Sequence, residues 1–113
     1  MEMNMFYKKS DSGYKTALKG VRYKTLAFGE KTHLTEFRLA KGSIIPKHTH
    51  PHEQTGYLVS GKMKFVIAGE IFDTEPGDGW NIAGDVEHEV DVLENSIVIE
   101  VFSPVRKEYL PFS

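Results

Sequence analysis

The sequence predicts an all-β fold in a single domain, and three observations lead to this expectation. Segments rich in aromatic and β-branched residues, most of them with alternating apolar and polar positions, follow one another along most of the chain. Short groups containing glycine, proline, asparagine or aspartate separate these segments, and no segment has the pattern of a long helix. The length of 113 residues suits one hydrophobic core and is too short for two.

Seven segments have the composition of strands. They are residues 21–28, 32–40, 56–61, 62–69, 70–74, 88–94 and 96–102. Turns are expected at residues 29–31, 60–62, 69–70, 76–78 and 94–95. Many short antiparallel strands in one small domain favour a sandwich or a barrel, because closure protects the strand edges.

The predicted domain comprises residues 1–113, with its core at about residues 20–103. Two prolines in the last stretch predict that residues 104–113 run along the surface as a C-terminal arm. Four large apolar side chains are expected in the core or in a cavity wall: Met63, Phe65, Phe72 and Trp80.

Composition and charge exclude several classes of function. Fourteen basic residues are scattered along the chain and 16 acidic residues offset them, which gives a net charge of -2 at pH 7. No basic stripe that would neutralise phosphates is present, so we expect no nucleic-acid partner. No signal-peptide pattern and no apolar run close to a membrane span occur, so we expect a cytoplasmic protein without membrane contact. The absence of cysteine means that a metal would be held by histidine, carboxylate or amide groups.

The stretch HTHPHEQ, residues 48–54, places three of the five histidines at alternate positions. Alternate side chains of a strand project to the same face, so this cluster either binds a metal ion or forms a solvated histidine-rich edge. Pro51 cannot donate to a strand ladder, so the strand is expected to end near His50. His52 is then expected in the following turn and not among metal ligands.

His88 begins a further alternating segment and is the candidate for a third imidazole ligand. If its strand neighbours His48 and His50, three imidazoles and the amide oxygen of Gln54 converge. An alternative role for Gln54 is to orient a bound water, because amides are weaker ligands than imidazoles or carboxylates. His33 belongs to no motif and is not expected to bind metal.

Five residues with fixed spacing carry a resemblance to a known family: Gly42, His48, His50, Gln54 and Gly61. Their pattern resembles the first conserved motif of the cupin family, which usually has glutamate at the position of Gln54. The resemblance spans roughly residues 40–103. It implies a single-domain cupin jelly-roll β-barrel.

A second cupin-like motif follows after a short spacer. It retains Gly77 and His88, and it departs from the usual proline, glycine and asparagine at Ala83, Asp85 and Val92. These departures concern turn geometry and leave the histidine in place. Together the two motifs imply one divalent metal ion with four ligands: His48, His50, Gln54 and His88.

The implied ligand set consists of three neutral imidazoles and a neutral amide. It leaves the charge of the ion uncompensated, so a bound water or substrate oxygen would be strongly polarised. Four protein ligands on a six-coordinate ion leave two positions open, which suits a small-molecule substrate that binds through two oxygens. Zinc, manganese, iron and nickel are all compatible with these ligands.

Glu100 is a carboxylate in an otherwise apolar strand. The surrounding run resembles a subgroup of single-domain cupins that act on unsaturated uronates released from pectin and alginate. In that subgroup an aspartate, a phenylalanine two residues further on and an arginine line the pocket. The matching positions here are Glu100, Phe102 and Arg106. Alternatively, Glu100 pairs with a lysine of a neighbouring strand and Arg106 is a solvated residue of the arm.

Three functions fit these residues. The first is a metal-dependent enzyme that opens or ketonises an unsaturated uronate, with Glu100 moving the proton and Arg106 binding the carboxylate. The second is an iron-dependent dioxygenase, because open positions beside three histidines can bind oxygen. The third is a non-catalytic module that binds a metal and a small ligand. By resemblance we also expect a homodimer, with residues 5–20 able to add a strand across the interface.

Overall fold

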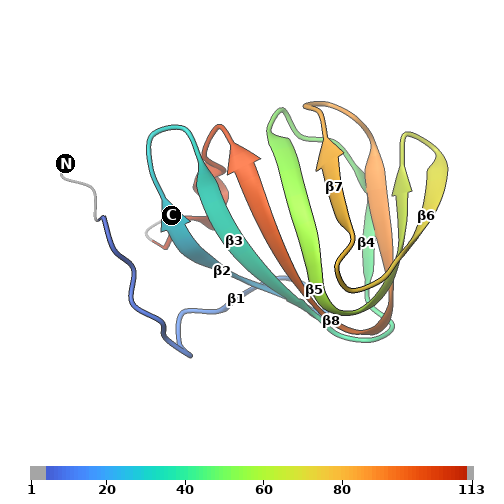
Figure 1. Ribbon diagram of the computed structural model, residues 1–113, viewed down its shortest axis with the longest axis horizontal. Coiled ribbons are helices and arrows are strands. Elements are labelled where there is room, and N and C mark those ends of the chain that lie inside the picture. Colours follow the sequence, from blue (N-terminus) through green and yellow to red (C-terminus); the bar gives the residue numbers. More distant parts are fainter. Residues whose placement is uncertain (1–4, 112–113) are drawn as a thin grey trace.

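A computed structural model describes residues 5–111, and strands dominate these residues (Figure 1). Eight strands follow one another along the chain: β1 (Lys15–Leu18), β2 (Val21–Phe28), β3 (His33–Leu39), β4 (Ile44–His48), β5 (Glu53–Ile67), β6 (Glu70–Thr74), β7 (Gly79–Ile82) and β8 (His88–Ser103). A short 3₁₀ turn, η1 (Lys107–Tyr109), follows the last strand. No helix among the described residues is long and apolar enough to cross a membrane. The all-β prediction is confirmed.

Two long antiparallel strands, β5 and β8, form the spine of the fold (Figure 1). The second half of β8 pairs with β3, and the first half of β5 pairs with β7. At the other end of the spine, β8 pairs with β4 and β5 pairs with β6. The order β1-β2-β3-β8-β5 therefore continues through the spine into a second group of strands. This arrangement is the predicted jelly-roll barrel.

The long strands replace four of the predicted shorter ones. Residues 56–61 and 62–69 fall almost entirely within β5, and residues 88–94 and 96–102 lie within β8, so the turns predicted at 60–62 and 94–95 are wrong. The pairing between the two strands shifts register between Leu58 and Met63. Gly61 in this stretch has a positive φ of 101°, and a Cβ there would collide with Ser96. The glycine therefore marks a bulge that bends the strand instead of ending it.

The hydrophobic core lines the interior of the barrel. Its buried members come from both groups of strands: Val21, Tyr23, Phe37, Leu39, Leu58, Met63, Phe65, Ile82, Val90, Val92, Val98 and Phe102. The predicted burial of Met63 and Phe65 is confirmed, whereas Phe72 is 43% exposed and that prediction is wrong.

The C-terminal segment does more than follow the surface. Leu110 is buried, and the ring of Tyr109 lies 4.3 Å from that of Tyr23 and 6.0 Å from that of Phe102, measured between ring centroids. The surface-arm prediction is wrong for these residues, because an aromatic ring gains more from packing on the core than from solvent. Three residues of the segment line the interior cavity: Arg106, Glu108 and Tyr109.

Candidate functional site

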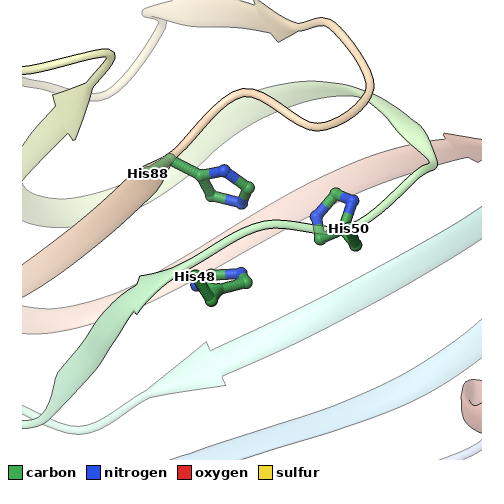
Figure 2. A group of neighbouring side chains, drawn as sticks. All are labelled: His48, His50 and His88. Atoms are coloured by element: carbon green, nitrogen blue, oxygen red, sulfur yellow. The ribbon is translucent and has the colours of Figure 1, made fainter.

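The pairing of β4 with β8 brings three histidines together (Figure 2). His48, the last residue of β4, lies opposite His88, the first residue of β8, and their ring centroids are 4.2 Å apart. His50 follows two residues after β4, and its ring centroid lies 4.9 Å from that of His88 and 5.6 Å from that of His48. Each ring can offer one nitrogen so that all three nitrogens lie within 4.8 Å of one another. The three histidines can hold a metal ion.

Backbone carbonyls fix the orientation of all three rings. In each case Nδ1 lies within hydrogen-bond distance of the carbonyl oxygen of a residue two positions away. The pairs are His48 with Pro46 (2.8 Å), His50 with His52 (3.0 Å) and His88 with Val86 (2.9 Å). A carbonyl can only accept, so each neutral ring carries its proton on Nδ1 and keeps the lone pair on Nε2. Such partners orient metal-binding histidines in proteins.

Two features of the ring nitrogens show that the site fits a cation. His88 Nε2 is buried and has no hydrogen-bond partner among the described residues. His50 Nε2 lies 2.9 Å from Oε1 of Gln54, so with the proton on Nδ1 two acceptors face each other. Buried acceptors without donors are costly, and a positive ion between them removes that cost. The donor set of imidazole nitrogens and one amide oxygen suits a divalent transition metal.

The protonation state of the cluster also suits metal binding. Burial lowers the pKa of His88 to about 4, and burial likewise lowers the pKa of His50. Both rings are therefore neutral at pH 7, and neutral imidazole is the form that binds a metal. His52 lies outside the group of three, with its ring centroid 5.6 Å from that of His50. Its contribution is the backbone carbonyl that orients His50.

Glu100 is joined to this cluster through Gln54. The amide Nε2 of Gln54 donates to Oε1 of Glu100 over 2.9 Å, and the indole Nε1 of Trp80 donates to Oε2 over 3.2 Å. Burial raises the pKa of Glu100 to about 8, while these two hydrogen bonds act in the opposite direction. The two donors replace the lysine partner considered from the sequence. A buried carboxyl group with a pKa near neutrality can both accept and donate a proton.

The contact between Trp80 and Glu100 depends on the glycine between them. In the strand register, Gly56 of β5 lies opposite Glu100 of β8 on one side and opposite Trp80 of β7 on the other. A Cβ at Gly56 would collide with both the indole Nε1 and the Glu100 carboxylate. The indole therefore reaches Glu100 across the space that a side chain would fill. The sequence placed Trp80 only in the core or cavity wall, because a contact between three strands leaves no local signal.

Replacing Gly56 with alanine is expected to push Trp80 away from Glu100 and to destabilise the fold by about 1–3 kcal/mol, the usual cost of overpacking. Trp80 is the single tryptophan, so its fluorescence emission should shift as its hydrogen bond is lost. Chemical unfolding and emission spectra measure the two effects. Gly29→Ala is the matched control, because a Cβ there meets no atom within 4 Å. Equal effects of the two substitutions would contradict the role assigned to Gly56.

Arg106 and Phe102 lie on the same cavity as the metal cluster. The cavity has a volume of about 570 Å³, and its polar lining includes His48, His88, Gln54, Glu100 and Arg106. The guanidinium carbon of Arg106 lies 5.1 Å from the ring centroid of Phe102 and 4.2 Å from that of Tyr109. Its side chain is 15% exposed, and its Nε donates to Oε1 of Glu108 over 2.7 Å. The alternative of a solvated arginine is therefore wrong.

A small jelly-roll barrel with three converging histidines beside an interior cavity places the chain in the class of β-barrel domains that can hold a metal ion. The chain belongs to the cupin family, and the family's cupin domain matches residues 35–102. It is 31% identical over 93 residues to the pectin degradation protein KdgF of Dickeya dadantii, covering 80% of this chain and 84% of that protein.

Solved structures show the same architecture. The KdgF structure from Halomonas sp. superposes with a TM-score of 0.87 at 27% identity, covering 93% of this chain and 99% of the other. An RmlC-like cupin from Shewanella frigidimarina superposes with a TM-score of 0.89 at 22% identity, covering 97% and 100% of the two chains. The resemblance to the cupin family and to its pectin-degradation members is thus confirmed.

Proposed function

We propose that this protein is a metal-dependent enzyme that opens or ketonises an unsaturated uronate. The observation that carries the proposal is the buried Glu100, linked through Gln54 to His50 of the histidine cluster and lining the same cavity as Arg106. A binding module needs no buried group that can exchange a proton, whereas an isomerase does. The similarity to KdgF supports the choice of substrate class.

One divalent ion would be held by Nε2 of each of three histidines, His48, His50 and His88, and by Oε1 of Gln54. When bound, the ion supplies Lewis acidity that polarises an oxygen of the substrate. The nitrogen and oxygen donors suit zinc, manganese, iron or nickel. Gln54 also has a second task, because its amide nitrogen holds the Glu100 carboxylate in place.

Side chains of the cavity bind the substrate and transfer the proton. Arg106 binds the substrate carboxylate, with its guanidinium plane supported by the rings of Phe102 and Tyr109. The ionised form of Glu100 removes the proton from the enol oxygen of the substrate, and the protonated group then gives a proton to the carbon of the double bond. The net change is conversion of an enol to a ketone, with no proton gained or lost overall. Trp80 and Gln54 hold both Glu100 oxygens during this transfer.

The experiment is to follow the absorbance of the conjugated double bond of unsaturated sugars derived from galacturonate, mannuronate and guluronate. Metal-loaded protein should accelerate the loss of absorbance, and chelator-treated protein should not. No turnover of any of the three would discard the substrate class. Consumption of oxygen by iron-loaded protein would then favour a dioxygenase, and ligand binding without turnover would favour a binding module.

Arg106→Lys is expected to raise KM about tenfold and to change kcat less. Lysine keeps the charge but loses the two parallel hydrogen bonds that a guanidinium can give to a carboxylate, and a charged hydrogen bond contributes about 1.5 kcal/mol or more. Steady-state kinetics of unsaturated-uronate conversion measures the effect. An unchanged KM would show that another group binds the substrate carboxylate.

The protein is also proposed to pair as a homodimer through an outer sheet face. Tyr57 and Val59 project outward from β5 and are each about half exposed, at 50% and 46%. Contiguous exposed apolar side chains often mark an interface. Size-exclusion chromatography with light scattering should give twice the chain mass at micromolar concentration, and a single monomeric mass would contradict the proposal.

A further inference from the structure

His33 is a fully buried histidine that the metal cluster does not use. It is the first residue of β3, its exposed fraction is 0%, and it lies opposite Phe28 of β2 and Phe102 of β8 in the strand register. It belongs to no sequence motif that would indicate a role. Its imidazole lies where β2, β3 and the C-terminal segment meet, and its hydrogen bonds with Arg106 and Thr25 can be assigned a direction.

The backbone N–H of Arg106 donates to Nδ1 of His33 over 3.3 Å. A backbone N–H can only donate, so Nδ1 is the unprotonated nitrogen and a neutral ring carries its proton on Nε2. Nε2 lies 2.8 Å from Oγ1 of Thr25 and 3.2 Å from Oγ1 of Thr35. This tautomer is the opposite of the one found in the three histidines of the metal cluster.

The chain of hydrogen bonds continues from Thr25 to the other end of the C-terminal turn. The Thr25 hydroxyl donates to the carbonyl oxygen of Tyr109 over 2.6 Å. The backbone N–H of Tyr109 in turn donates to the carbonyl of Arg106 over 3.0 Å. A closed ring of bonds thus runs from Arg106 through His33 and Thr25 to Tyr109 and back.

We propose that His33 is a positioning residue, whose neutral Nε2-protonated ring fastens the turn from Arg106 to Tyr109 to β2 and β3 and so holds the Arg106 guanidinium at the cavity. The inference rests on the proposed function in one respect, the role of Arg106 as the carboxylate-binding group. His33 itself does not touch the cavity's metal ligands or the substrate, and it acts through the backbone of Arg106.

The contacts of the guanidinium explain why such an anchor is needed. Two of its partners, Tyr109 and Glu108, belong to the same turn and move with it. The third, Phe102, belongs to the barrel but supplies only a ring face. The turn is attached to the barrel by the bonds through His33 and Thr25 and by the packing of the Tyr109 ring, and Lys15 Nζ donates to the carbonyl oxygen of the adjoining Pro111 over 3.4 Å.

The surroundings of His33 keep it in the neutral form that this arrangement requires. Burial lowers the pKa of His33 to about 4, and the positive charge of Arg106 and the ring of His52 act in the same direction. The Glu108 carboxylate acts in the opposite direction, with a smaller effect on the pKa than burial or Arg106. At pH 7 the ring is therefore neutral, with one nitrogen that donates and one that accepts. The hydrogen bonds with Arg106 and Thr25 require this form.

The test uses Thr25→Val, which removes the hydroxyl and keeps the shape of the side chain. Loss of the two bonds made by that hydroxyl should raise amide exchange rates of residues 106–110 about tenfold. KM for unsaturated galacturonate should rise about tenfold while kcat stays within about threefold. Thr25→Ser restores the hydroxyl and should restore both values. Thr35→Val is the matched control, because Thr35 contacts the same imidazole, whereas the bond to the Tyr109 carbonyl is made by Thr25.

A nitrogen-15 spectrum of the His33 side chain should show the proton on Nε2 at pH 7. A proton on Nδ1, unchanged exchange in Thr25→Val, or equal effects of the Thr25 and Thr35 substitutions would overturn the proposal. Faster exchange with an unchanged KM would also overturn it, because the turn would be held without positioning Arg106. Absence of wild-type turnover would instead defeat the proposed function, while the exchange rates and the tautomer would still decide whether His33 fastens the turn.

Discussion

Replacing His48 with alanine is expected to strip most of the divalent metal from the protein. The substitution leaves two imidazoles and a weakly coordinating amide, so the affinity should fall by more than the roughly 10- to 100-fold that loss of a hydrogen-bond partner of a metal ligand costs. The folded state should also lose the stabilisation from binding, about 2.7 kcal/mol when free metal is at 100 times its Kd. Metal analysis after dialysis and thermal unfolding measure the two effects.

His52→Ala is the matched control for this substitution. His52 belongs to the same HTHPHEQ stretch but lies outside the group of three, and alanine keeps the backbone carbonyl that orients His50. Metal content and stability should therefore stay close to wild type. Equal metal loss in the two variants would mean that His52 is a ligand. Retention of metal in both variants would contradict the proposed metal site.

The three-histidine cluster was largely predictable because its signal is local. His48 and His50 alternate in sequence, and His88 starts a segment with strand periodicity, so antiparallel pairing of two strand ends suffices to bring them together. The backbone partners of the rings were not predictable. They depend on the local path of the backbone just before each histidine, as in the carbonyls of Pro46 within β4 and of Val86 before β8, which no residue pattern encodes.

The side-chain contacts around Glu100 were not predictable either, because they join strands distant in sequence. Trp80 reaches Glu100 across Gly56, and these three residues come from three different strands. One feature of the fold was also not predictable from local sequence. Gly61 has the composition expected of a turn, but it marks a bulge inside β5. A glycine is equally compatible with a turn and with a β-bulge, and the pairing with neighbouring strands determines which of the two forms.

Glu100→Gln is expected to lower kcat for unsaturated-uronate conversion by about 10²- to 10⁴-fold, the usual contribution of a general acid/base group. Glutamine matches glutamate in shape and can still accept the hydrogen bond from Trp80, but it cannot take a proton from the substrate and return it. Its amide also places a donor near the amide of Gln54, so a small stability loss is expected. Loss of double-bond absorbance measures the rate, and metal analysis checks that the site remains loaded.

Glu94→Gln provides the matched control, because it makes the same chemical change at an exposed position of the same strand. It should leave kcat, KM and metal content unchanged. If Glu100→Gln lost its metal together with its activity, the rate loss would reflect the ligand Gln54, whose amide Glu100 holds, instead of a missing proton carrier. Wild-type turnover that survives Glu100→Gln undiminished would keep the substrate class and discard Glu100 as the group that moves the proton.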